Sequence, residues 1–254
     1  MSYVVFTYII ILILCCIEYL LHYKFIRFLK PDLTIKQKAY IFSIKSSLTL
    51  FLAGIYYNYY YFTSKFDESG FYSILEETNS LNFGKLIVIY FTAYLIMDLI
   101  IGLIEYPKEI GLLTGYIHHS VYIIINIISL YLGIYPIYLL NMLSELPTLL
   151  ISIGIFDSTF RNDTLFGMSF FTTRLFYHGI LTYTFRHNYI FFYISLATLG
   201  LHGYWFYNWW NKYGKKIITL DRKKKRKIKI KNKISKKKLK NVFNSKIKIK
   251  IKKK

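Results

Sequence analysis

Two adjacent histidines, His118 and His119, lie within an apolar stretch that is long enough to cross a lipid bilayer. Ionisable side chains are expensive at membrane depth, so they usually face a cavity or a partner and indicate a functional site. An imidazole held beside a carboxylate can act as a general base or as a nucleophile. The histidine pair therefore predicts acid–base or acyl-transfer chemistry inside a membrane domain.

Other apolar stretches also carry polar side chains, and helical spacing groups some of them. Asn141 lies four residues before Glu145, so both share one helix face. Arg174 and His178 have the same spacing. Several such groups on separate helices suggest one shared polar interior. The candidate residues are therefore His118, His119, Asp98 and Glu145 for catalysis, and Arg174, Asn141 and His202 for substrate binding.

Two other interpretations of these residues remain open. Buried polar side chains can simply hold membrane helices together. Histidine and carboxylate ligands also suit zinc or iron. Adjacent histidines diverge by about 100° around a helix, however, so His118 and His119 cannot easily bind one ion. No metal and no other cofactor are expected.

The composition combines membrane-like apolarity with strong basicity. Hydrophobic residues make up 54% of the chain, aromatic residues make up 20%, and the formal net charge is +21. Residues 1–211 hold 12 of the 34 Lys and Arg and 12 of the 13 Asp and Glu, which leaves 22 basic residues and one acid for 212–254. An ordinary soluble domain is excluded, and the basicity belongs to the tail.

The elements that must position the candidate residues are seven apolar runs. Each has about 20 residues, which matches a hydrocarbon core of about 30 Å. The runs are continuous rather than alternating, so they predict helices and not the strands of a barrel. We therefore expect an all-α, polytopic membrane helix bundle of about seven transmembrane helices, a six-helix core preceded by one span. The runs are 3–21, 40–62, 86–104, 111–132, 136–155, 165–184 and 190–210.

The charges predict three regions and an orientation. Residues 1–35 form the first span and a basic loop, 36–211 form the six-helix domain, and 212–254 form a lysine-rich, disordered tail. By the positive-inside rule the tail is cytosolic, and the basic segment 22–38 falls on the same side. The tail would attract anionic lipid headgroups or nucleic acid, and it meets lipid first because it is tethered to the membrane. The lysines at the C-terminus also fit a dilysine retrieval pattern of the endoplasmic reticulum.

The order of the polar features resembles the TLC-domain family, which includes ceramide synthases and translocating-chain-associating membrane proteins. The resemblance covers about 36–210. It rests on Tyr94-Leu95-Ile96-Met97-Asp98, His118-His119, Ser144-Glu145-Leu146-Pro147-Thr148, Phe170-Phe171-Thr172-Thr173-Arg174 and Trp205.

The resemblance implies six helices around a polar cavity in which the paired histidines belong to an acyl-transfer site. The aspartate motif that follows the histidines in ceramide synthases is not visible, and the segment 144–148 resembles the branch associated with membrane lipid composition. We therefore expect an endomembrane protein that acts on membrane lipid. The alternatives are a lipid-binding protein without catalysis and, less favoured, a transporter or channel, which would require discontinuous helices at mid-span.

Overall fold

The regular structure is helical throughout the part of the chain described by the computed structural model, residues 2–64 and 83–215. Five helical segments are long and apolar enough to cross a membrane, which confirms the predicted class of helical membrane bundle. They are Val5–Leu29, Ile35–Thr63, Phe83–Glu105, Leu112–Tyr131 and Tyr135–Phe156.

The first two spans form three helices. The helix α1 (Ser2–Leu29) is followed by the single turn α2 (Ile35–Lys38) and by α3 (Ile41–Ser64). Thr34 caps α2 because its hydroxyl accepts from the amide of Gln37, while the Gln37 side chain accepts from the amide of Thr34. These two hydrogen bonds close the loop after α1 and begin the turn α2, which leads into α3.

The third and fourth spans contain the residues that motivated the site prediction. The helix α5 (Phe83–Glu105) carries Asp98. A short π-helix, η1 (Leu112–Ile117), leads directly into α6 (His118–Tyr131), so the histidine pair begins a regular helix at the point where the helical geometry changes. Short π-helical segments occur frequently at functional sites.

The fifth span is broken into three pieces. The helix α7 (Tyr135–Leu140) passes into a 3₁₀ segment, η2 (Asn141–Glu145), and then into α8 (Leu146–Phe156). Pro147 lies in the first turn of α8, where its missing amide hydrogen costs no helical hydrogen bond. Pro147 therefore marks the start of a helix.

The sixth and seventh predicted spans are helical, but neither is among the five segments apolar enough to cross a membrane. The sixth comprises α9 (Asp163–Ser169), the π-helix η4 (Phe170–Tyr177) and α10 (His178–Thr184), and a 3₁₀ turn, η3 (Ser158–Phe160), precedes it. The seventh is α11 (Tyr189–Trp209), followed by the π-helix η5 (Trp210–Gly214). Polar groups such as Arg174 and His178 in the sixth lower its apolar character.

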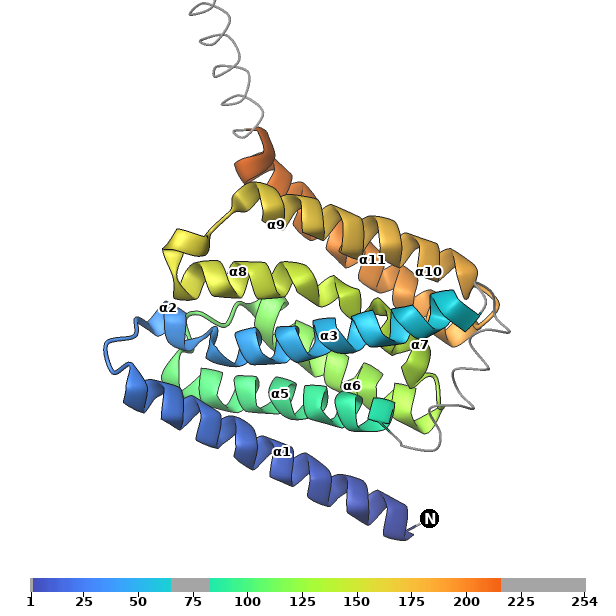
Figure 1. The fold of residues 1–254 in the computed structure, drawn as a ribbon, viewed down its shortest axis with the longest axis horizontal. Coiled ribbons are helices and arrows are strands. Elements are labelled where there is room, and N and C mark those ends of the chain that lie inside the picture. The colour runs from blue at the N-terminus through green and yellow to red at the C-terminus, as the bar shows by residue number, and fades with distance from the viewer. Residues whose placement is uncertain (1, 65–82, 216–254) are drawn as a thin grey trace, which may run out of the picture. The chain divides into compact units, whose positions relative to one another are not determined.

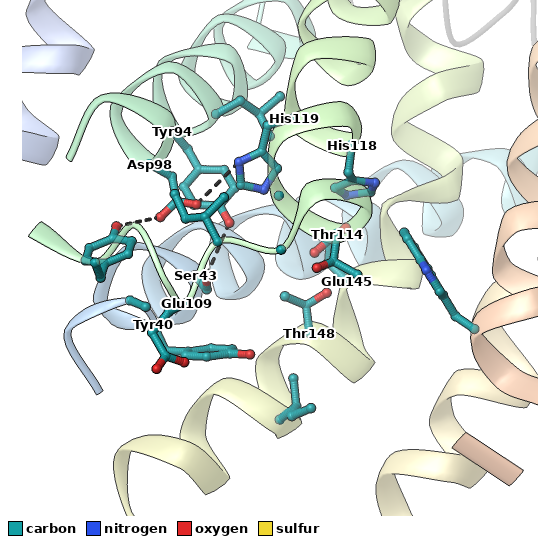
Figure 2. A pocket seen from close by; sticks show the side chains of 18 of the residues that line it. Tyr40, Ser43, Tyr94, Asp98, Glu109, Thr114, His118, His119, Glu145 and Thr148 are labelled. Atoms are coloured by element: carbon teal, nitrogen blue, oxygen red, sulfur yellow. Dashed lines mark hydrogen bonds and ion pairs between the residues drawn. The ribbon is translucent and has the colours of Figure 1, made fainter. Parts of the chain in front are cut away.

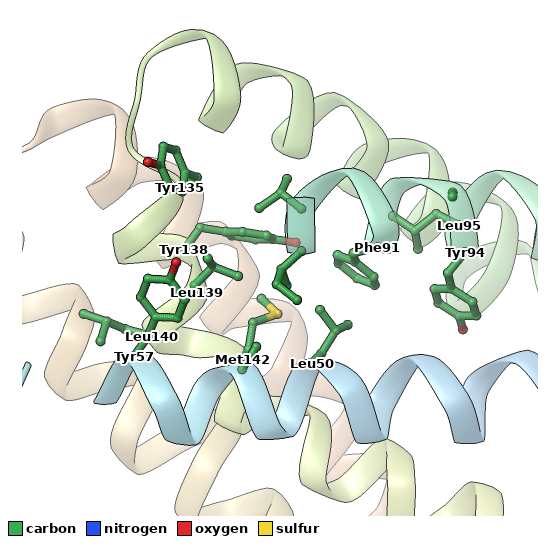
Figure 3. Close-up of a cluster of buried hydrophobic side chains, with 14 of the residues drawn as sticks. Leu50, Tyr57, Phe91, Tyr94, Leu95, Tyr135, Tyr138, Leu139, Leu140 and Met142 are labelled. Carbon is green, nitrogen blue, oxygen red and sulfur yellow. The ribbon is translucent and has the colours of Figure 1, made fainter. Parts of the chain in front are cut away.

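The helices meet around a core rich in aromatic side chains. The helix α1 packs mainly along α5 (Figure 1). The helix α3 packs against both η2 and α8. Leu50, Tyr57, Phe91 and Leu139 lie in one buried cluster contributed by α3, α5 and α7 (Figure 3). Contacts among these buried apolar side chains stabilise the bundle through dispersion attraction.

A close backbone contact fixes α3 against the broken fifth span. A Cβ atom on Gly54 would lie 2.6 Å from the backbone nitrogen of Leu143, so only glycine fits this crossing. The Asn58 amide nitrogen donates to the carbonyl of Leu140 at 2.8 Å. This bond joins α3 to the backbone at the point where α7 passes into the 3₁₀ segment.

The chain divides into two compact units, residues 1–206 and 207–254. The predicted boundary lies at 211/212, close to this division. Of the second unit, the structure describes only 207–215, which complete α11 and form η5. Residues 212–215 of the predicted tail are helical, and the expectations of disorder and of contact with anionic headgroups otherwise concern residues that lie beyond the described ranges.

Candidate functional site

The candidate site is centred on a carboxylate and an imidazole from neighbouring helices. Asp98 of α5 and His119 of α6 are buried, with 6% and 7% of their surface exposed. The Nδ1 atom of His119 lies 3.3 Å from Oδ2 of Asp98, which is an ion-pair distance, although the two atoms are not aligned as a hydrogen bond. A carboxylate in this place favours the tautomer that carries its proton on Nδ1 and leaves Nε2 as the base.

A tyrosine outside the predicted span holds the other oxygen of Asp98. The hydroxyl of Tyr106 donates to Oδ1 of Asp98 at 2.8 Å (Figure 2). Burial, together with the adjacent Asp98 carboxylate, raises the pKa of Tyr106, so its hydroxyl remains a donor. Tyr106 thus leaves only one carboxylate oxygen to face His119.

The second histidine has different surroundings. The His118 ring lies 4.5 Å from the ring of Tyr122 and 5.3 Å from that of Trp205, measured between centroids. His118 and His119 point to different sides of α6, as their adjacent positions predict, and both face the same cavity (Figure 2). The structure therefore pairs one histidine with an acid and encloses the other between aromatic rings.

A notch between two glycines positions the start of α6. A Cβ atom on Gly115 would lie 2.3 Å from Cγ2 of Ile110, and one on Gly102 would lie 1.7 Å from its Cδ1. The Ile110 side chain thus fills the space between α5 and η1 that the two glycines leave. This contact anchors the turn that precedes the histidine pair.

Arg174 of η4 also lines the cavity. Its Nε donates to the carbonyl of Ser144 at 2.7 Å, and its Nη2 donates to the hydroxyl of Thr148 at 2.6 Å. The same Nη2 lies 3.8 Å from Oε1 of Glu145, and the guanidinium lies over the ring of Phe170 at 5.1 Å. Arg174 is therefore oriented by the broken fifth span rather than left mobile.

These residues surround a cavity of about 260 Å³. Five predicted site residues line it together with Trp205: Asp98, His118, His119, Glu145 and Arg174. Thr114 and Thr148 add hydroxyl groups to the same wall (Figure 2). The tertiary structure thus brings polar side chains from α5, η1, α6, η2, α8 and η4 together around one cavity within an apolar bundle.

The other two predicted residues lie elsewhere. Asn141 and His178 border a smaller cavity of about 40 Å³. His202 is 2% exposed and lies in a hydrogen-bonded network with His178 of α10. Neither Asn141 nor His202 lines the large cavity.

The hydrogen bonds of this second network have a single consistent direction when both histidines are neutral. Thr182 donates its only hydroxyl hydrogen to the carbonyl of His178 at 2.8 Å, so Ser195, 2.6 Å away, must donate to Thr182. The Nε2 atom of His178 lies 2.8 Å from the Ser195 oxygen and must therefore carry a hydrogen. Its Nδ1 atom is left as an acceptor.

His202 completes the chain. Its Nδ1 atom lies 3.4 Å from Nδ1 of His178 and 3.3 Å from the carbonyl of Arg174, and both of these atoms accept. Its Nδ1 hydrogen therefore serves two acceptors. Because the hydrogen of Ser195 is directed at Thr182, His178 does not act as its base, and the network ties α11 to α10 and to the backbone of η4.

The sequence interpretation missed some of the side chains around the cavity. The sequence pattern does not single out Tyr106, because it follows the span, although it lies two helical turns beyond Asp98 on the same face. Tyr94, whose hydroxyl lies 3.2 Å from that of Ser43, entered only through the family resemblance. Helical spacing could have indicated Tyr106, whereas the contact of Tyr94 with α3 is long-range.

Within 2–64 and 83–215, no three His, Cys, Asp or Glu side chains gather as possible metal ligands. Comparisons with family models, with curated proteins and with solved structures found no match to this chain.

Proposed function

We propose that this protein is a TLC-type membrane protein that acts on a membrane lipid in the cavity around Asp98 and His119. The observation that carries the proposal is the 3.3 Å approach of an imidazole and a carboxylate at the wall of a 260 Å³ cavity. Asp98 and His119 lie on two helical segments apolar enough to cross a membrane, so a lipid is the substrate class that reaches their cavity most directly.

The reaction that suits these groups is acyl transfer to a hydroxyl or an amine. Nε2 of His119 takes the proton of the acceptor, whose oxygen or nitrogen attacks the acyl carbonyl. The bond from the carbonyl to the leaving group then breaks, and the leaving group takes the proton from His119. Asp98 stabilises the imidazolium between these steps, as an acid partner does in other catalytic pairs.

Arg174 and His118 have supporting roles in this proposal. The positive charge of Arg174 lies where it can hold an anionic part of the substrate, with Thr148 and Glu145 fixing its direction. His118, between Tyr122 and Trp205, forms part of the wall that a lipid would contact. His119 rather than His118 is the base in this proposal, because only His119 has a carboxylate beside it.

The proposal also includes the location and the tail. A multi-pass protein of the endoplasmic reticulum with a cytosolic C-terminus accounts for the basic segment 22–38 and for the basic residues of 212–254. Those basic residues would attract anionic headgroups. A protease-protection assay on sealed vesicles tests the orientation, since a cytosolic C-terminal tag must be removed without detergent.

The decisive experiment compares wild type with His119→Gln and Asp98→Asn in cells and in purified form. If the protein is an enzyme, lipidomics will show one lipid class that changes with the wild type and not with either variant. If it binds lipid without catalysis, His119→Gln keeps both the bound lipid and the cellular lipid profile. If both histidine substitutions, His118→Gln and His119→Gln, leave lipids unchanged and no lipid copurifies, the proposal fails.

A further inference from the structure

A short connection, residues 106–111, joins the spans Phe83–Glu105 and Leu112–Tyr131. Because it follows the end of one span and precedes the next, it lies at the surface of the membrane. Four of its residues line the large cavity: Tyr106, Glu109, Ile110 and Gly111. Its outer side is exposed at 107–109, whereas Tyr106 is only 1% exposed. The connection thus lies between the cavity and the water beyond this end of the bundle.

Both ends of the connection are held in place. Before it, Glu105 at the end of α5 forms an ion pair with Arg27 of α1 at 2.6 Å. After it, the carbonyl of Gly111 accepts from the amide of Gly115 at 2.8 Å, in the first turn of η1. A segment between two such fixed ends can move as a hinged loop while the helices on either side keep their positions.

Two side chains fasten the connection to α5. The hydroxyl of Tyr106 donates to Oδ1 of Asp98 at 2.8 Å (Figure 2). The side chain of Ile110 fills the space over Gly102, where a Cβ atom would lie 1.7 Å from its Cδ1. Asp98 and Gly102 are four residues apart on α5, so both contacts lie on one helix face. The connection is therefore fastened along a single stripe of α5 at the wall of the cavity.

These contacts can be released without unfolding the bundle. The amide of Tyr106 donates to the carbonyl of Gly102 at 3.1 Å, so its backbone continues α5 and only its side chain has to turn away. The hydrogen bond from the amide of Glu109 to the carbonyl of Tyr106, at 3.0 Å, lies within the connection. Exposed segments that few buried contacts hold open locally at a free energy well below that of global unfolding.

We propose that residues 106–111 form a gate between the cavity and the water at this end of the bundle, and that Asp98 latches the gate through Tyr106. The gate controls the passage of small water-soluble molecules, since it opens at the membrane surface rather than toward the lipid. Asp98 faces His119 with its other oxygen, Oδ2, at 3.3 Å. The carboxylate that orients the candidate base thus also holds the gate shut, although the gate depends on the cavity and not on the proposed reaction.

The test measures how fast a small, membrane-impermeant thiol reagent reaches a cysteine inside the cavity. In a full-length chain without its two native thiols, Cys15→Ala and Cys16→Ala, Ser43→Cys introduces one thiol at a cavity residue that is 8% exposed. The reagent is sulfonatoethyl methanethiosulfonate, and intact-mass spectrometry follows its reaction with the protein in phosphatidylcholine nanodiscs. Tyr106→Phe should raise the rate about tenfold, because it removes a hydrogen bond to a carboxylate. Ile110→Ala should also raise it.

Two controls separate the opening of a gate from general loosening of the protein. Tyr116→Phe removes a hydroxyl from η1 at a residue outside the cavity lining, and it should leave the rate unchanged. Ser158→Cys, which replaces Ser43→Cys as the only thiol and is exposed, should react equally fast with and without Tyr106→Phe. A clear increase in either control would contradict the gate.

A double-mutant cycle tests the latch itself. Asp98→Asn keeps the side-chain size but weakens the acceptor, so it should raise the rate alone, and Tyr106→Phe should then add less than it does in the wild type. Independent effects of the two changes would remove Asp98 from the gate. A rate that Tyr106→Phe leaves unchanged, or a Ser43→Cys thiol that reacts in no variant, would overturn the proposal. Asp98→Asn and Ile110→Ala supply the same test if Tyr106→Phe does not fold. Because the assay measures access and not turnover, its failure is distinct from a failure of the proposed reaction.

Discussion

The two buried histidine clusters of this bundle differ in how fully the protein uses their hydrogen-bonding capacity. In the network of His178 and His202, each assigned hydrogen has an acceptor, and the chain ends on backbone carbonyls. In the other cluster, His119 faces the Asp98 carboxylate and a cavity wall. Histidine therefore holds helices together in the network of His178 and His202, whereas His119 lines a cavity in which a bound molecule could meet it.

The largest expected effect is on turnover at the cluster of His118 and His119, which lines the cavity. His119→Gln should lower the rate of lipid modification by about 10²-fold or more, because glutamine cannot take a proton from the acceptor. Rates are measured as product formed per protein in membranes of equal expression. The matched change in the network of His178 and His202, His202→Gln, should alter the rate much less. Equal losses in both variants would remove the distinction between the clusters.

The hydrogen-bonded network of His178 and His202 should instead contribute more to the free energy of unfolding. His178→Leu removes one hydrogen-bond partner from each of the buried Ser195 and His202, which keep Thr182 and the Arg174 carbonyl, and should lower the free energy of unfolding by about 1–3 kcal/mol. Denaturant titration in detergent micelles measures this value. Tyr183→Phe, at an exposed tyrosine of the same helix, is the control and should change it by less than about 0.5 kcal/mol. A His178→Leu protein as stable as the control would refute the structural role.

A third prediction concerns the start of α6. Gly115→Ala places a methyl group against Ile110 and should destabilise the protein by about 1–3 kcal/mol through overpacking. Ile110→Ala removes the colliding atoms, so the double variant should recover part of the loss. A double-mutant cycle without coupling would show that the glycine is not needed for this contact.

The smallest expected effect is at Tyr106. Tyr106→Phe removes the hydrogen bond to Asp98 and should cost about 1–2 kcal/mol of stability. Because the pKa of Tyr106 is raised in the folded protein, the unfolded chain loses this proton first. The contribution is fully present below about pH 10, the ordinary tyrosine pKa, and declines above it. Denaturant titrations at pH 7, 9 and 10.5 should therefore show the wild type losing more stability at alkaline pH than Tyr106→Phe does.

The sequence predicted the ionisable residues of the cavity but not which of them lie beside one another. Asp98, His118, His119, Glu145 and Arg174 were recognised because ionisable groups are rare in apolar runs. The assignment of His119 rather than His118 to Asp98 depends on how α5 packs against α6. No local pattern contains that information.

A change of helical geometry explains why α-helical spacing predicted the position of Asn141 incorrectly. Asn141 and Glu145 are four residues apart, but η2 is a 3₁₀ segment, so they do not share a face as they would on an α-helix. Glu145 lines the large cavity, whereas Asn141 borders the small one. Glu18 and Lys45 were missed for a different reason, since each is a single charge near the end of its apolar run and only the contact of α1 with α3 pairs them.

The sequence by itself determined that this is a helical membrane protein, because the length and continuity of apolar runs are local properties that the bilayer dimension converts into helices. It also determined which side chains are costly enough to need a partner. The tertiary structure alone decided which partner each one has. Asp98 meets Tyr106 and His119, Glu18 meets Lys45, and His178 meets His202, because these pairs depend on contacts between helices rather than on spacing within one.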